Sequence, residues 1–316
     1  MERVYSGLVI SGGTFFVPPP YPHRHLRATM QKSRAYNTLT GWLMVSPLAL
    51  VLFIFLVLPI VMIAIVSFWQ TTAFSIVPAF QLENYEFLFG SPVTYTVFIN
   101  TFKYAALTWI FTVLIGFTVA FYLAFHVRSL TWQVVLFLLC TIPFLTSNII
   151  RMISWIPFLG RNGIANSTLI SWGLIDEPVE WLLFSDFSVV LAFVHIYTLF
   201  MVVPIFNTMM RIDKGIIEAA RDGGASGAQI LWNIIIPLTK PGIMIGTIFV
   251  VTLVMGDFFT VRIMSGSQSA NVGRLISNDI SLLQYPSASA TAIILLLTVL
   301  IVIGVLLRFV DIRKEL

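Results

Sequence analysis

The sequence predicts an all-α integral membrane protein with about six transmembrane helices. Hydrophobic residues make up 58% of the 316 residues and charged residues only 10%, whereas a soluble domain carries roughly a quarter charged residues. The apolar residues are also gathered into long stretches, and a helix needs about 20 such residues to cross the hydrocarbon core of a bilayer. We therefore expect lipid to cover much of the surface of the chain.

Six stretches meet this length, and five of them contain no Asp, Glu, Lys or Arg. The remaining stretch carries a single charge, Asp257. Together they predict a transmembrane domain over 39–316 that follows a polar, cytoplasmic N-terminal tail over 1–38. The predicted spans are 44–68, 104–125, 129–150, 187–210, 241–260 and 287–307, and the longest loops are 70–103, 151–186, 211–240 and 261–286.

The distribution of Lys and Arg predicts the orientation of these spans. Cytoplasmic loops of membrane proteins carry an excess of both residues. With a cytoplasmic N-terminus, most of the eighteen Lys and Arg residues fall on the cytoplasmic side. We therefore expect both termini and the loop 211–240 in the cytoplasm. The outer side then holds Lys103, Arg151, Arg161, Arg262 and Arg274.

The loop 211–240 differs from the other loops in its pattern of small and apolar residues. Residues 213–222 favour a short helix, and Gly223 and Gly224 can end it, because glycine readily adopts the left-handed conformation that follows many helices. Residues 229–236 predict a second apolar helix, which Pro237 stops. Two short helices at an angle, with a small-residue face and one carboxylate, suit docking into a groove of another protein.

The spacing within this loop resembles a known family signature. Glu218-Ala219-Ala220 is followed by three residues, Gly224, nine residues, Ile234, one residue and Ile236-Pro237. This pattern is similar to that of the permease subunits of bacterial binding-protein-dependent ABC importers, with Ile236 in place of a leucine. The resemblance implies the fold of a type I ABC importer permease, in which this loop contacts the ATPase subunits. It assigns ATPase coupling to Glu218, Ala219, Ala220, Gly224, Ile234 and Pro237.

Within that family the chain looks most similar to the spermidine/putrescine-type permeases, through stretches such as Ser67-Phe68-Trp69 and Glu83-Asn84-Tyr85. The resemblance implies a multi-pass protein of the bacterial inner membrane. Its partners would be two ATPase subunits, a second and related permease forming a heterodimer, and a periplasmic substrate-binding protein, with no nucleic acid. Mg-ATP would be held by the ATPase subunits, because this chain has no Gly-x-x-x-x-Gly-Lys-Ser/Thr phosphate loop. We therefore expect no catalytic residue, no cofactor and no enzymatic activity in this chain.

Polar and aromatic residues in or beside the spans are candidates for the substrate pathway. A carboxylate within a span is costly unless it faces a pathway or a partner, so Asp257 contacts a cationic cargo, pairs with Arg262, or lies at the membrane interface. His195 either lines the pore or is a neutral, hydrogen-bonded side chain between helices. Arg151 and Trp155 either gate the pore, touch the binding protein, or anchor the chain at the interface. The candidates are Asp257, His195, Tyr197, Arg151 and Trp155, and with one cysteine we expect no metal site.

Several alternatives remain open at this stage. Acidic outer loops and Asp257 favour a small organic cation such as a polyamine, whereas Arg262 favours an anionic or phosphonate-like cargo. The chain departs from its relatives at Thr198-Leu199 and Val261-Arg262, which also leaves the cargo open. An ATP-independent secondary transporter or channel would show paired broken helices or several buried charges.

An intramembrane serine protease is a further alternative, because Gly224-Ala225-Ser226-Gly227 has the form that such enzymes use. Those enzymes need a histidine on a later span. All four histidines of this chain precede Ser226, and Ser226 lies in a charged loop. We therefore reject the protease interpretation.

Overall fold

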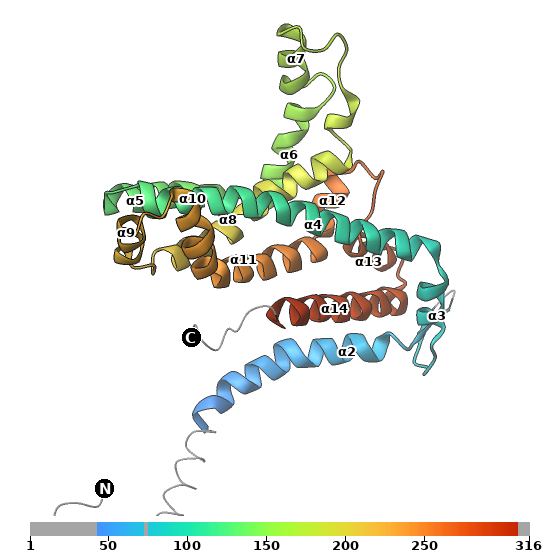
Figure 1. Ribbon diagram of the computed structural model, residues 1–316. Helices are drawn as coiled ribbons and strands as arrows, with labels where there is room; N and C mark the ends of the chain where they lie inside the picture. Colours follow the sequence, from blue (N-terminus) through green and yellow to red (C-terminus); the bar gives the residue numbers. More distant parts are fainter. Residues whose placement is uncertain (1–42, 73–74, 309–316) are drawn as a thin grey trace, which may run out of the picture. The chain divides into compact units, whose positions relative to one another are not determined.

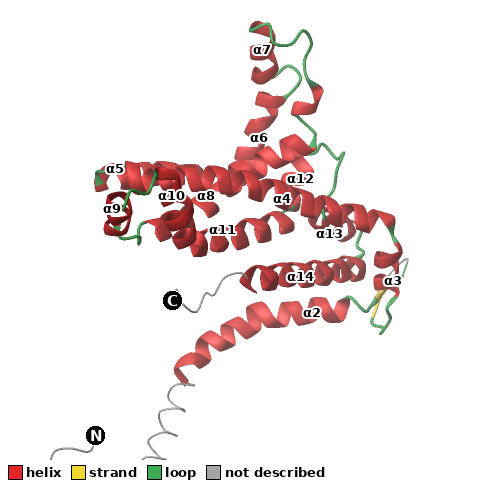
Figure 2. Cartoon of the chain, in the orientation of Figure 1, coloured by secondary structure: helices red, strands yellow, loops and turns green. Residues whose placement is uncertain are grey.

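The computed structural model describes residues 43–72 and 75–308, and helices account for most of them (Figures 1 and 2). The predicted tail 1–38 lies outside these residues. In the described part, five helices are long and apolar enough to cross a membrane, and a sharply bent helix pair brings the number to as many as six. The prediction of an all-α membrane fold is therefore confirmed. The chain divides into two compact units, one ending at Ile60 and one beginning at Val61.

The first predicted span is a helix over Leu43–Val66. It contains a π-helical turn at Phe53–Val57 and continues as α2 (Leu58–Val66). This turn lies just before Pro59, whose ring nitrogen has no hydrogen to donate to the preceding turn. The wider π turn accommodates the proline without ending the helix.

The predicted loop 70–103 contains more structure than expected. A short antiparallel pair, β1 (Gln70–Thr71) and β2 (Ile76–Val77), precedes α3 (Glu83–Gly90). The second span, α4 (Pro92–Phe121), begins well before residue 104 and ends in a π turn over Tyr122–His126. The span was expected to begin at residue 104, directly after the charged Lys103. This start was wrong: Lys103 lies inside the helix, where Asp186 neutralises its charge.

The third predicted span, 129–150, is broken by a sharp bend in the structure. α5 (Leu130–Thr141) tightens into a 3-10 turn over Ile142–Leu145, which contains Pro143. The chain then bends by 87°. It continues as α6 (Asn148–Leu159) and α7 (Ile164–Ser171), which extend away from α4 and α8 (Figure 1). A 3-10 turn, Glu180–Leu182, leads back to the bundle.

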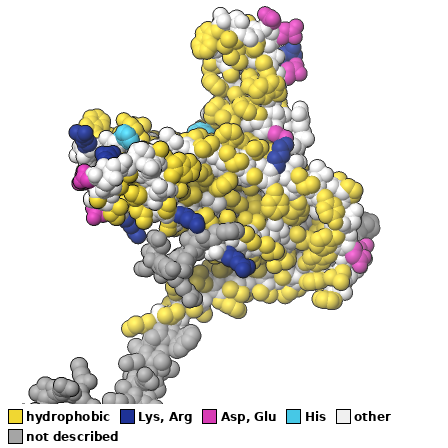
Figure 3. Space-filling model, viewed as in Figure 1, with side chains coloured by type: hydrophobic (Ala, Val, Ile, Leu, Met, Phe, Trp, Pro, Cys, Tyr) yellow, Lys and Arg dark blue, Asp and Glu magenta, His cyan; other side chains and the backbone are white. Residues whose placement is uncertain are grey.

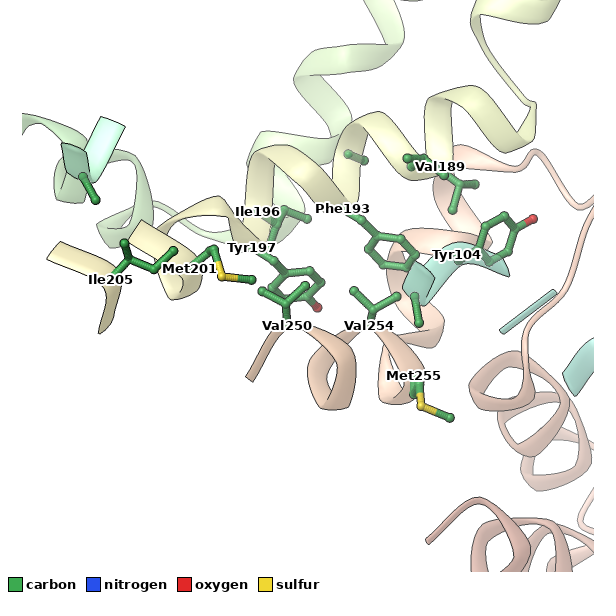
Figure 4. Close-up of a cluster of buried hydrophobic side chains, with 14 of the residues drawn as sticks. Tyr104, Val189, Phe193, Ile196, Tyr197, Met201, Ile205, Val250, Val254 and Met255 are labelled. Carbon is green, nitrogen blue, oxygen red and sulfur yellow. The ribbon is translucent and has the colours of Figure 1, made fainter. Parts of the chain in front are cut away.

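The core lies between α4, α8 (Asp186–Met209) and α11 (Ile236–Gly256). The three helices approach closely because glycines face the fully buried Met201 of α8: Gly116 from α4 and Gly246 from α11. Aromatic and aliphatic side chains from all three helices form the buried core along this interface (Figure 4). They include Tyr104, Phe193, Ile196, Ile205, Val250 and Val254.

The loop 211–240 folds largely as the sequence predicts. α9 (Lys214–Asp222) is followed by α10 (Gly227–Ile230) and a π turn over Leu231–Ile235. Pro237 does not stop the second helix, which was expected to end there. It lies in the first turn of α11, directly after the π turn, so the chain runs as one helix from Gly227 to Gly256.

The last part of the chain contains α12 (Phe258–Met264), α13 (Val272–Ser281) and α14 (Tyr285–Arg308). Hydrogen bonds join the two short helices to the core: Ser188 Oγ donates to the Met264 carbonyl at 2.9 Å, and the Val272 amide donates to Thr101 Oγ1 at 3.0 Å. α14 corresponds to the predicted span 287–307.

Charged side chains are concentrated away from the apolar sides of the helices. In Figure 3, hydrophobic side chains cover most of the visible sides of the helices. Charged side chains gather at the tip of the α6–α7 arm and around α9. Apolar side surfaces of this extent are expected of helices that face lipid.

The close contact between α8 and α11 can be tested at Gly242. A Cβ atom there would lie 2.5 Å from the Pro204 carbonyl oxygen and even nearer to Thr208 Oγ1. Because the backbone of α8 cannot move aside cheaply, we expect Gly242→Ala to destabilise the fold by about 1–3 kcal/mol. Thermal unfolding in detergent measures this loss. Gly304→Ala is the matched control, since no atom lies within 4 Å of the added methyl group, and an equal effect of both changes would contradict the packing.

Candidate functional site

Asp257 lies at a break between two helices. α11 ends at Gly256, and Asp257 adopts an extended backbone before α12 begins. Its Oδ1 accepts a hydrogen bond from the Thr260 amide at 2.9 Å, so the carboxylate caps α12. The predicted span 241–260 is therefore wrong at its end. A residue with a capping side chain interrupts the helix there, and hydropathy alone does not reveal such a break.

The other oxygen of this carboxylate meets the buried Tyr197 of α8. Asp257 Oδ2 accepts hydrogen bonds from Tyr197 Oη at 2.7 Å and from Thr260 Oγ1 at 2.5 Å. The predicted alternative of an ion pair with Arg262 is wrong. Within residues 43–72 and 75–308, the ion pairs are Lys103–Asp186 and Arg161–Glu180, so no Lys or Arg neutralises Asp257.

Asp257 and Tyr197 line a cavity of about 390 Å³. Asn148 from α6 and Thr252 from α11 add polar atoms to its wall. The hydroxyl of Thr252 is buried and has no hydrogen-bond partner among the described residues. The rest of the wall is largely apolar, formed by Met152, Leu253, Gly256 and Phe259. The cavity thus combines one negative charge with neutral hydrogen-bonding groups and apolar surface.

Three of the predicted pathway residues lie together in a second cavity of about 350 Å³. Trp155 of α6 donates its indole N–H to His195 Nδ1 of α8 at 3.0 Å. Because Nδ1 accepts this bond, the neutral ring carries its proton on Nε2. Arg151 lies in the same cavity and is buried. His195 thus accepts a hydrogen bond and also lines a cavity, so both predicted interpretations of this residue stay open.

Asn148 connects the two cavities. Its side chain lines the Asp257 cavity, and its Oδ1 accepts a hydrogen bond from Arg151 Nη2. A second, longer bond runs from Arg151 Nη2 to the Thr146 carbonyl at 3.4 Å, whereas Arg151 Nε is buried without a partner among the described residues. The five predicted residues therefore form two neighbouring groups, one negative and one positive.

Sequence reasoning did not find Asn148 and Thr252, because uncharged polar residues are common in spans. It also missed a polar cluster around Asp186, which accepts hydrogen bonds from Lys103 and Tyr104. Tyr104 Oη also bonds Ser269 Oγ at 2.7 Å. The one available signal was charge: Lys103 and Asp186 are opposite charges at the ends of two predicted spans.

We call α9 and the turn that follows it, residues 213–226, the α9 corner. One face of α9 packs against the core, and the other face is exposed. Asp213 caps the helix by accepting a bond from the Gly215 amide at 2.9 Å, and Ile217 is buried against the core. Glu218 and Ala219 are exposed on the outer face, whereas Ala220 packs against the core.

Gly224 ends α9, as the sequence predicts. Its φ is +82°, and the amides of Gly224 and Ala225 donate to the carbonyls of Arg221 and Ala220, both at 2.9 Å. This pair of bonds is the Schellman arrangement, which needs a left-handed residue. Ser226 then caps α10 by accepting a bond from the Gln229 amide at 3.3 Å. The serine thus has a structural role, consistent with rejecting a protease.

Comparison with known families matches residues 113–314 to a model described as the binding-protein-dependent transport system inner membrane component. The match covers more than half of the chain. It includes α8, α11 and the α9 corner. The chain belongs to this family of ABC importer permeases. The permease is therefore an inner membrane component of an importer that depends on a binding protein, and its family is one of transport proteins rather than enzymes.

Curated relatives of the permease carry related names. It is 34% identical over 272 residues to the spermidine/putrescine transport system permease protein PotB of Escherichia coli, covering 85% of this chain and 93% of the relative. It is 31% identical to PotB of Haemophilus influenzae over 214 residues, covering 67% and 73% of the two chains. A third relative, the Escherichia coli inner membrane ABC transporter permease protein YdcU, is 26% identical over 214 residues, covering 64% and 67%.

Solved structures share the fold of the permease. A chain of a bacterial ABC transporter involved in the import of the acidic polysaccharide alginate superposes with a TM-score of 0.67 at 16% identity, covering 90% of this chain and 98% of the other. The alginate transporter in complex with an alginate pentasaccharide-bound periplasmic protein gives a TM-score of 0.65, also at 16% identity, covering 87% and 94%. This similarity confirms a type I ABC importer permease-like fold.

Proposed function

We propose that the permease passes a small organic cation, with polyamines favoured, through the inner membrane as part of an ATP-driven importer. The observation that carries the proposal is the carboxylate of Asp257, which faces a cavity and has no cationic partner among the described residues. The names of the PotB relatives support the same class of cargo. A periplasmic binding protein delivers this cargo to the outer side.

The chemistry of the Asp257 cavity suits a polyamine. An ammonium group gains a charge-assisted hydrogen bond from a carboxylate, which is stronger than a bond between neutral groups. The Tyr197 hydroxyl oxygen offers a further acceptor, and the apolar wall formed by Met152, Leu253 and Phe259 suits a methylene chain.

Arg151 favours a second candidate cargo of opposite charge. Its Nε is buried without a partner among the described residues, in the neighbouring cavity with Trp155 and His195. An anionic or phosphonate-like solute would find its counter-charge there. We favour the cation because Arg151 Nη2 is already held by Asn148 and Thr146, whereas the charge of Asp257 is not neutralised.

The α9 corner transmits the action of the ATPase subunits in this proposal. Glu218 bonds to the ATPase surface, Ala219 and Ala220 permit close approach, and Gly224 makes the bend, while Ile234 and Pro237 place the following helix. This requires α9 and both termini in the cytoplasm. Mg-ATP is bound by two ATPase subunits, and this chain contributes no cofactor. A second, related permease completes the wall of the pore.

Asp257→Asn separates the charge of this residue from its capping role, because asparagine also caps helices well. We expect uptake of radiolabelled spermidine by the complete importer to fall about tenfold or more, since a hydrogen bond to a charged group contributes about 1.5–3 kcal/mol. Thermal stability should stay close to that of the unchanged protein.

Asp257→Ala is the control, and it should lose both uptake and stability. Unchanged spermidine uptake by Asp257→Asn would overturn the cation site. A gain in uptake of an anionic solute, lost on Arg151→Gln, would favour the second candidate cargo.

Glu218→Lys tests the α9 corner. Reversing the charge on the exposed outer face should uncouple ATP hydrolysis from uptake, with membrane insertion unchanged. The ratio of cargo transported to ATP hydrolysed in proteoliposomes measures the coupling. Glu86→Lys, an equivalent change on α3, is the matched control and should leave the ratio unchanged; normal coupling in Glu218→Lys would rule out the role.

The partner subunits can be identified by purification. We expect an affinity-tagged permease to bring down a second, related permease in equal amount, together with ATPase subunits, and mass spectrometry of the intact complex measures this. A complex with two copies of this chain and no other permease would contradict the heterodimer.

A further inference from the structure

A groove of about 610 Å³ lies beside the C-terminal end of α8, away from the two cavities described above. Residues of α8 and α11 make up most of its lining, α14 contributes Leu306 and Leu307, and α9 contributes Ile216. All of these residues belong to one compact unit. Nothing in the transport proposal uses this groove.

The polarity of the groove changes along the face of α8. Val203 and Pro204 are apolar, Asn207 and Thr208 follow one turn later, and Arg211 lies two residues after the end of the helix. The facing side of α11 stays apolar throughout, with Leu238, Pro241, Met244, Ile245 and Ile248. The groove therefore fits a molecule with one long apolar part and one polar end.

The polar end of the groove carries one basic and one acidic side chain, Arg211 and Asp213, which do not pair with each other. Arg211 is exposed and forms no ion pair with another described residue. Asp213 is the one acidic residue in the groove, but its Oδ1 accepts the amide hydrogen of Gly215 and caps α9. The guanidinium of Arg211 thus remains available to an anion, and arginine matches phosphate geometry well.

We propose that this groove binds an anionic phospholipid of the surrounding bilayer. The phosphate lies at Arg211 and one acyl chain lies along Ile245 and Ile248. A soluble anion would leave the apolar walls exposed to water, and an apolar helix of a partner would leave the charge of Arg211 unmatched at its edge. Because Ile216 of α9 lines the same groove, the lipid also contacts the corner that we assign to ATPase coupling.

Binding of defined lipids to the purified importer complex tests the proposal. The complex is delipidated, titrated with phosphatidylglycerol or phosphatidylcholine, and analysed by native mass spectrometry. We expect Arg211→Gln to weaken phosphatidylglycerol binding about fivefold, because one basic side chain near an anionic lipid contributes about 1 kcal/mol. Phosphatidylcholine binding should not change. Arg128→Gln, at another exposed arginine that does not line the groove, is the matched control.

Three results would overturn the proposal: unchanged phosphatidylglycerol binding in Arg211→Gln, an equal loss in Arg128→Gln, or displacement of the bound lipid by inorganic phosphate alone. A photoreactive side chain at position 245 gives an independent answer in native membranes. An adduct with lipid supports the proposal, and an adduct with a partner subunit would show that a protein helix fills the groove instead.

Discussion

In a bilayer every backbone N–H and C=O must find a partner within the protein, and this constraint explains where the helices of the permease are interrupted. At Asp257 the side chain supplies the partner for the Thr260 amide, and the carbonyl of Asp257 accepts a bond from Asn271 Nδ2 at 2.8 Å. At Pro143 a 3-10 turn closes the end of α5. Before Pro59 and before Pro237 a π turn widens the helix, and the helix continues past each proline.

The same constraint explains the position of the candidate site. In an uninterrupted helix the backbone N–H and C=O groups are already hydrogen-bonded to each other. A cavity with several polar atoms therefore forms most easily beside a break. Asp257 lies at the break between α11 and α12, and Asn148 lies just after the bend between α5 and α6. Close packing around Met201 holds α8 against α11, and this packing keeps Tyr197 within hydrogen-bonding distance of Asp257.

The sequence predicted the elements that depend on local composition. Apolar stretches located the long helices, and two adjacent glycines located the end of α9. It did not predict features that depend on residues far apart. The start of α4 required knowing that Lys103 meets Asp186, 83 positions later. The same limit applies to the site, because Asp257 and Tyr197 were each visible as candidates, but only the packing of α8 on α11 brings them together.

The helix that begins at Gly227 has a mechanical consequence. It runs unbroken through the π turn and through Pro237, and it ends at Gly256, next to Asp257. Thirty residues of helix span about 45 Å, which exceeds the thickness of the hydrocarbon core. The π turn, Pro237 and Pro241 are the positions along it where a helix bends most easily. A displacement at its first residues is therefore carried towards Asp257 along one continuous helix, and these positions near its start decide how much of the movement is absorbed.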